Sequence, residues 1–183
     1  MKKNNRGVTL IELLVSIAIL GIIAVGATGF LVVGSKTYNN VSYSVRLQYE
    51  SQLVMNQIQK YVISCSDGIA WDSANNTLYV ADAADDGGDT LYVFRFDPVS
   101  GCLYFGSGAA AATPVGADDL MAEHITGISV AFSAAGSAGR ANSAAVEISM
   151  ARGTKTYTGK QTIALRNQPL AASSWSDLWN VLQ

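Results

Sequence analysis

The chain has 183 residues and a formal net charge of −2, and 14% of its residues are charged. This length allows one soluble domain in addition to a terminal segment. The slight excess of acidic residues gives a poor surface for nucleic acid, which binds clustered lysine and arginine, so we expect no nucleic-acid partner.

The first 33 residues carry the clearest pattern. A basic leader, residues 1–7, is followed by an uncharged apolar run from Leu13 to Val33. A helix of this run would be roughly 31 Å long, enough to cross the hydrocarbon core of a membrane. The positive charges before it predict a cytoplasmic N-terminus and an exported remainder. A cleaved secretory signal fits less well, because the run is long and no small-residue cleavage site ends it.

Glu12 is unusual because it stands at the edge of the predicted membrane span. A carboxylate near hydrocarbon is costly and usually has a partner or a task. The simpler interpretation is an ordinary signal anchor with an acid near the membrane interface.

The succession of basic leader, Gly7, Val8-Thr-Leu-Ile-Glu12 and clean apolar span resembles the leader of type IV pilins and type II secretion pseudopilins. In that family a prepilin peptidase cuts after the glycine and methylates the new first residue. The glutamate at the fifth mature position neutralises the terminal amine of a neighbouring subunit. The resemblance therefore implies processing between Gly7 and Val8, and it implies that Glu12 acts in assembly with other pilin subunits.

Two departures from the family pattern favour a minor member. Val8 stands where major pilins usually carry phenylalanine, and Gly29 where they often carry a helix-kinking proline. Arg166-Asn167 after the last predicted strand also resembles J-like pseudopilins and W-like minor pilins. The resemblance implies a structural subunit of a type IV pilus or a type II secretion pseudopilus. Such a subunit is a single-pass protein of the cytoplasmic membrane before it enters a cell-surface or periplasmic filament.

The predicted helix continues beyond the membrane. Ser35 to about Ser64 contains neither proline nor glycine, and apolar residues recur at helical intervals. This stripe should pack on the soluble domain, and it comprises Tyr43, Leu47, Val54, Ile58, Val62 and Cys65. We therefore divide the chain into leader 1–7, membrane and filament-core helix 8–34, and extracytoplasmic domain 35–183.

After this helix the pattern changes to short runs of β-forming residues separated by turns. The expected strands are Thr77–Ala81, Thr90–Phe96, Cys102–Phe105, Thr126–Phe132, Ala144–Met150 and Thr156–Leu165. Asp97–Gly101 has the residues of a turn, and Ala109–Asp119 is expected to be a loop. The fold class is therefore α+β, pilin-like, with a long N-terminal helix packed on an antiparallel sheet.

The C-terminal segment Ser174–Gln183 predicts a short amphipathic helix. Trp175, Leu178, Trp179 and Leu182 share one helical face, and Ser174 with Asp177 can cap its start. Tryptophans often anchor partner subunits, yet an apolar helical face more often docks on its own domain, so we expect docking.

The sequence gives little support for a catalytic function. His124 is the only histidine, and no Gly-x-Ser-x-Gly motif occurs. We interpret His124 and its neighbour Glu123 as a surface loop pair and the protein as a non-enzyme. An alternative to the filament subunit is a single-pass membrane-anchored surface protein that captures a ligand.

Two candidate sites remain. An acidic glycine-bearing loop offers oxygen ligands to calcium, although without EF-hand spacing, from Asp82, Asp85, Asp86 and Asp89. We expect no other cofactor. Cys65 and Cys102 can form a disulfide if the domain is exported, and two free thiols are the alternative.

Overall fold

The computed structural model describes residues 9–83, 89–135 and 139–182. The chain divides into two compact units, Met1–Ser42 and Tyr43–Gln183, and the helix α1 contributes to both. The leader, with Gly7 and Val8, lies outside the described residues, as do Asp85 and Asp86 of the acidic loop.

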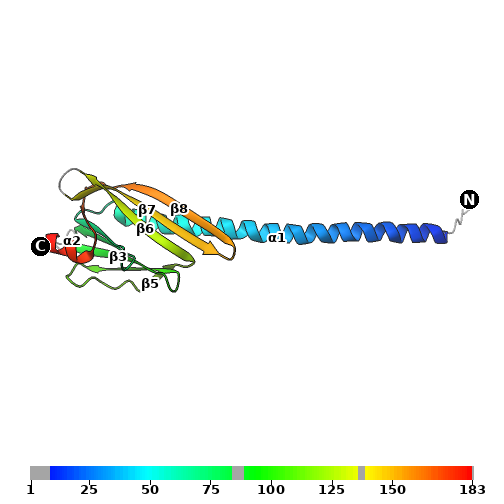
Figure 1. Ribbon diagram of the computed structural model, residues 1–183, viewed down its shortest axis with the longest axis horizontal. Coiled ribbons are helices and arrows are strands. Elements are labelled where there is room, and N and C mark those ends of the chain that lie inside the picture. Colours follow the sequence, from blue (N-terminus) through cyan, green and yellow to red (C-terminus); the bar gives the residue numbers. More distant parts are fainter. Residues whose placement is uncertain (1–8, 84–88, 136–138, 183) are drawn as a thin grey trace, which may run out of the picture. The chain divides into compact units, whose positions relative to one another are not determined.

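Helix α1 runs without interruption from Leu10 to Val62 (Figure 1). Thr9 precedes it, and its hydroxyl accepts a bond from the Glu12 backbone N–H at 3.4 Å. Thr9 and Glu12 therefore stand at the two positions of a capping box, in which a threonine N-cap is followed three residues later by glutamate. The long helix expected from the sequence is confirmed, and it ends about two residues earlier than predicted.

Among the described residues of the second unit, nine strands and a second helix follow α1. In chain order they are β1 (Gly68–Asp72), β2 (Thr77–Ala83), β3 (Asp89–Asp97), β4 (Cys102–Ala109), β5 (Asp119–Ala122), β6 (Ile125–Ala135), β7 (Arg140–Arg152), β8 (Lys155–Ala164), β9 (Leu170–Ala172) and α2 (Trp175–Leu182). The six expected strands are all present, and each is longer than or shifted from its predicted bounds by a few residues.

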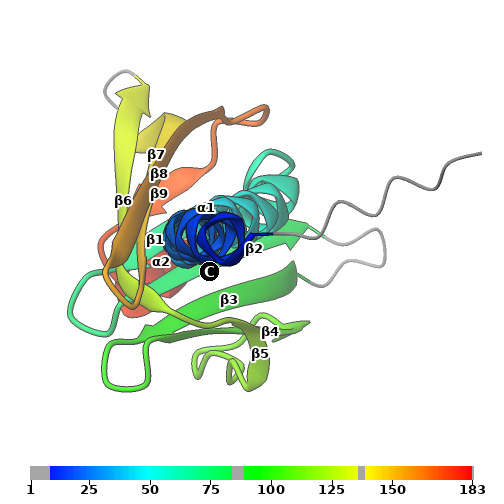
Figure 2. The ribbon, with the colours of Figure 1, turned by 90° about the vertical axis from the view of Figure 1, so that its right-hand side faces the viewer.

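The strands form one curled sheet in the order β5-β4-β3-β2-β1-β9-β7-β6, with β8 paired to β7. All pairs are antiparallel except β1 with β9, which are parallel. Figure 2 shows β3, β4 and β5 on one side of α1 and β6, β7 and β8 on another. The α+β, pilin-like fold is therefore confirmed, with the sheet wrapped around the part of α1 that belongs to the second unit.

The face of α1 that packs on the sheet largely matches the predicted stripe. Leu47, Val54, Ile58 and Val62 are at most 3% exposed. Tyr43, at 43% exposure, was wrongly placed in this face. Arg152 covers its ring, with the guanidinium carbon 5.5 Å from the ring centroid.

Ser51 is buried in the same helix face although its polarity gave no such indication. A Cβ atom on Gly159 of β8 would come within 2.7 Å of the Ser51 hydroxyl oxygen. Helix and strand therefore approach closely here, and the approach depends on two small residues that an apolar pattern does not reveal.

The strand β2 is buried on both faces, because the sheet separates two apolar clusters. Leu78 and Val80 belong to the cluster under α1. Tyr79 and Ala81 belong to the cluster that contains Trp175 and other residues of α2. This arrangement explains the continuous burial of β2, since a strand covered on both sides needs no polar face.

The predicted C-terminal helix docks on its own domain as expected. Trp175 and Leu178 are at most 4% exposed. The Ser174 hydroxyl accepts a bond from the Asp177 N–H at 3.1 Å, which confirms the predicted cap. Leu178 lies so close to Gly68 of β1 that a Cβ there would meet its side chain at 2.5 Å.

The disulfide that the sequence left open is not formed, and both cysteines are free. The Cys65 thiol donates to the carbonyl of Ala81 on β2. Ala81 is in register with Leu91 on β3, and Leu91 is in register with Gly108 on β4. Cys102 is six residues from Gly108 along β4, about 20 Å away at the rise of a strand. A disulfide requires Cα atoms within about 7 Å, so the two thiols are out of reach.

The two thiols should differ sharply in reactivity. Burial, followed by the charges of Asp82 and Asp67, raises the pKa of the Cys65 thiol to about 12. At pH 8 about one Cys65 in ten thousand is then a thiolate, and its burial further blocks access. We expect iodoacetamide to modify Cys102 in the folded protein and Cys65 only after unfolding. Peptide mass spectrometry after brief labelling tests this, and equal labelling of both thiols would contradict it.

Candidate functional site: the apolar half of α1

The part of α1 in the first unit presents apolar side chains in all directions. The exposed large residues include Leu10, Ile11, Leu13, Leu14, Val15, Ile17, Ile19, Leu20, Ile22, Ile23, Val25, Phe30, Leu31, Val32 and Val33. By length and composition this is a helix that can cross a membrane. Such exposure needs an apolar environment, which lipid or other apolar helices supply.

The polar groups within this segment are largely satisfied by the helix itself. The Ser16 hydroxyl donates to the carbonyl of Glu12 at 2.7 Å, and the Thr28 hydroxyl donates to that of Ala24 at 2.8 Å. Bonds of this kind let hydroxyl groups enter hydrocarbon without loss of a partner. The helix also continues through Gly29, where no atom outside the local helix lies within 4 Å of the point that a Cβ atom would occupy.

Glu12 is the acidic residue that the structure describes at the start of this apolar segment. It lies in the first turn of α1, where a negative charge is favoured by the positive end of the helix dipole. The capping-box position thus gives Glu12 a local structural role that sequence reasoning did not consider. Capping of the helix needs only a hydrogen-bonding side chain at this position, whereas pairing with the amine of another subunit needs the negative charge of Glu12.

The calcium candidate is only partly described, because Asp85 and Asp86 lie outside the described residues. Asp82 belongs to β2 and accepts a bond from Ser66, and Asp89 begins β3. Burial and the nearby carboxylate of Asp89 raise the pKa of Asp67 beside them. Among the described residues no group of three or more His, Cys, Asp or Glu side chains fits a metal ion.

Comparison with known protein families matches residues 2–28 to the prokaryotic N-terminal methylation motif. A search of the curated proteins finds no match. The matched segment contains the leader, Glu12 and most of the exposed apolar helix. This motif is the N-terminal signal of type IV pilins and pseudopilins, which are structural proteins and not enzymes.

The motif implies processing by a prepilin peptidase and assembly with other pilins. The apolar helix and the motif are together consistent with a membrane-anchored prepilin that later enters a filament.

Proposed function

We propose that this chain is a minor pilin or pseudopilin, assembled into a type IV pilus or a type II secretion pseudopilus. The observation that carries this proposal is the coincidence of the methylation motif with an apolar helix exposed in all directions. Val8 and Gly29 support a minor member, since major pilins usually carry phenylalanine and proline there.

In this proposal the prepilin peptidase cuts between Gly7 and Val8. Removal of residues 1–7 deletes three positive charges and leaves 9 positive and 14 negative residues. It also creates a new terminal amine on Val8, and Glu12 becomes the fifth residue of the mature chain. The apolar helices of several subunits then pack together, and the Glu12 carboxylate pairs with the amine of a neighbour. Pairing matters in an apolar core, because an unpaired buried charge is strongly unfavourable.

Processing tests the proposal directly. Coexpression of the full chain with a prepilin peptidase should yield a protein that lacks residues 1–7 and carries a methyl group on Val8. Gly7→Val should block the cut, because a branched side chain at the scissile bond obstructs the peptidase. Intact-mass measurement of the purified protein detects both outcomes.

Gly34→Val is the matched control, since it makes the same substitution in α1 where nothing lies within 4 Å of the new Cβ. This variant should be processed like the wild type. A wild-type chain that keeps its leader after coexpression would contradict the proposal, and it would favour a single-pass surface-binding protein.

A further inference from the structure

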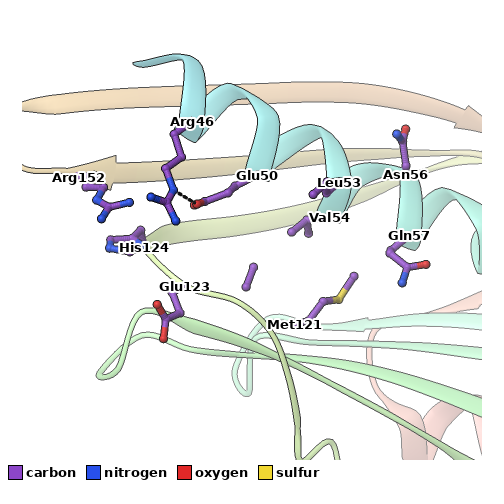
Figure 3. A pocket seen from close by; sticks show the side chains of 11 residues that line it. Arg46, Glu50, Leu53, Val54, Asn56, Gln57, Met121, Glu123, His124 and Arg152 are labelled. Atoms are coloured by element: carbon purple, nitrogen blue, oxygen red, sulfur yellow. Dashed lines mark hydrogen bonds and ion pairs between the residues drawn. The ribbon is translucent and has the colours of Figure 1, made fainter. Parts of the chain in front are cut away.

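The second unit contains a cavity of about 660 Å³ that its proposed role in a filament does not explain. One wall is α1, with Arg46, Glu50 and Leu53, and the other includes Met121, His124 and Arg152 (Figure 3). Its volume falls within the roughly 300–1,000 Å³ typical of sites for small ligands. We call it the Arg152 cavity.

One end of the Arg152 cavity gathers groups that can donate hydrogen bonds to an anion. Figure 3 shows the side chains of Arg46, His124 and Arg152 close together there. Arg46 bonds Glu50 through Nε at 3.0 Å, which uses one of its five N–H groups. Arg152 lies over Tyr43 and forms no ion pair within the described residues.

His124 is held in this position by its backbone and not by its side chain. It has a φ of 64°, which is uncommon for a residue other than glycine, and its carbonyl accepts a bond from Ala151 at 2.9 Å. Its ring atom Nδ1 is buried and has no hydrogen-bond partner within the described residues. A buried polar atom without a partner is unfavourable. The expected surface loop pair is found between β5 and β6, although His124 is half-buried whereas Glu123 is exposed.

The middle of the Arg152 cavity is apolar. Leu53 is 48% exposed although it is a large hydrophobic residue, and in Figure 3 Leu53, Val54 and Met121 lie between the basic end and the amides of Asn56 and Gln57. A ligand with a branched aliphatic group would cover Leu53 and contact the flexible thioether of Met121, which adapts to different shapes.

No carboxylate of the described residues pairs with Arg152. Glu50 is paired with Arg46, and the exposed Glu123 lies near His124 at the same end of the cavity in Figure 3, where it forms no ion pair within the described residues. A guanidinium binds a carboxylate through two parallel N–H groups, a geometry that favours Arg152 as the main contact.

We propose that the Arg152 cavity binds a carboxylate carried on an aliphatic group, as at the C-terminal leucine of a peptide or in a branched small acid. The carboxylate pairs with Arg152, with Arg46 and the His124 ring nearby, and the aliphatic group lies on Leu53 and Met121. The proposal does not depend on which filament the chain enters.

Matched probes test the charge requirement on the full chain in detergent micelles. N-acetyl-leucine carries the carboxylate, N-acetyl-leucinamide is its neutral counterpart, and leucinamide is the cation. Methionine methyl groups labelled with carbon-13 report binding by NMR, because Met121 lines the cavity whereas Met150 is fully buried and does not line it. N-acetyl-leucine should shift the Met121 signal at millimolar concentration and leave that of Met150 in place. The neutral and cationic probes should bind at least about tenfold more weakly.

A variant locates the carboxylate contact. Arg152→Gln should weaken N-acetyl-leucine about tenfold or more, whereas Arg166→Gln removes an equal charge at an exposed position and should have no effect. No binding of N-acetyl-leucine, equal binding of the neutral probe, or equal effects of the two variants would each overturn the proposal. A fourth probe, 4-methylpentanoate, distinguishes the sources. Binding equal to that of N-acetyl-leucine indicates a small acid, and weaker binding indicates a peptide terminus.

Discussion

Ile58→Asp should unfold the domain of residues 43–183. Ile58 is completely buried in the face of α1 that the sheet surrounds. The substitution removes its packing and puts an unpaired carboxylate in an apolar cluster. Loss of the aliphatic side chain alone costs about 2–5 kcal/mol, and the buried charge adds several more. This total approaches the whole stability of a typical domain. Circular dichroism during thermal unfolding of the detergent-solubilised chain should show no cooperative transition for the domain.

Gln52→Asp is the control for this experiment. It introduces the same residue into the same helix at an exposed position. Its melting temperature should lie within a few degrees of the wild type, because exposed substitutions usually change stability by about 0.5 kcal/mol or less. Similar melting curves for the two variants would mean that Ile58 does not pack against the sheet.

Glu12→Gln should sharply reduce entry into filaments while leaving membrane insertion intact. If Glu12 pairs with the amine of a neighbouring subunit, loss of its charge leaves that amine unpaired in an apolar core. Breaking a buried pair costs about 3–5 kcal/mol, so incorporation should fall by at least about tenfold. Immunoblots of membrane and sheared-filament fractions measure both quantities.

Glutamine also separates the assembly role from the local role of Glu12. A capping box accepts glutamine in place of glutamate, so a residue that only caps α1 would tolerate this change. Wild-type amounts of Glu12→Gln in the filament fraction would therefore contradict the ion pair. Thr28→Val is the control for altered polarity in the apolar segment, because the Thr28 hydroxyl bonds only its own helix among the described contacts. It should enter filaments normally.

Much of the fold is predictable from the sequence because its main features are local and periodic. The helical spacing of Leu47, Val54 and Ile58 indicated the buried face of α1, and the turn residues Asp97–Gly101 indicated the β3–β4 hairpin. The structure confirms that hairpin, with a positive φ at Gly101 that glycine adopts without strain.

The short strands β1, β5 and β9 were missed. The strand β9 has only three residues, and it is formed because β1 lies beside it in the sheet. The five residues of β1 show no alternation, since all of its first three are buried. Strands of this kind depend on neighbours that are distant in sequence, so local propensity gives little indication of them.

The N-terminal motif and the Arg152 cavity likewise differ in how far the sequence alone could predict them. The motif around Gly7, Val8 and Glu12 is contiguous, so sequence alone was sufficient to identify it. The Arg152 cavity joins residues near positions 46, 124 and 152, and the fold alone brings them together. The unusual backbone of His124 is equally invisible in the sequence.

The pairing of β1 with β9 has a consequence for the timing of folding. Gly68 lies in register with Leu170, whose N–H donates to the Asp67 carbonyl, and Asn167 donates to the Ser64 carbonyl across 103 residues of chain. During synthesis α1 emerges first, whereas β9, the strand that joins the two parts of the sheet, emerges only after β8. The nascent chain must therefore keep β1 and the apolar face of α1 from aggregation until β9 has been made. Contacts between such distant residues also slow folding. We expect this domain to form after the ribosome has delivered α2, and to be most vulnerable to proteases before then.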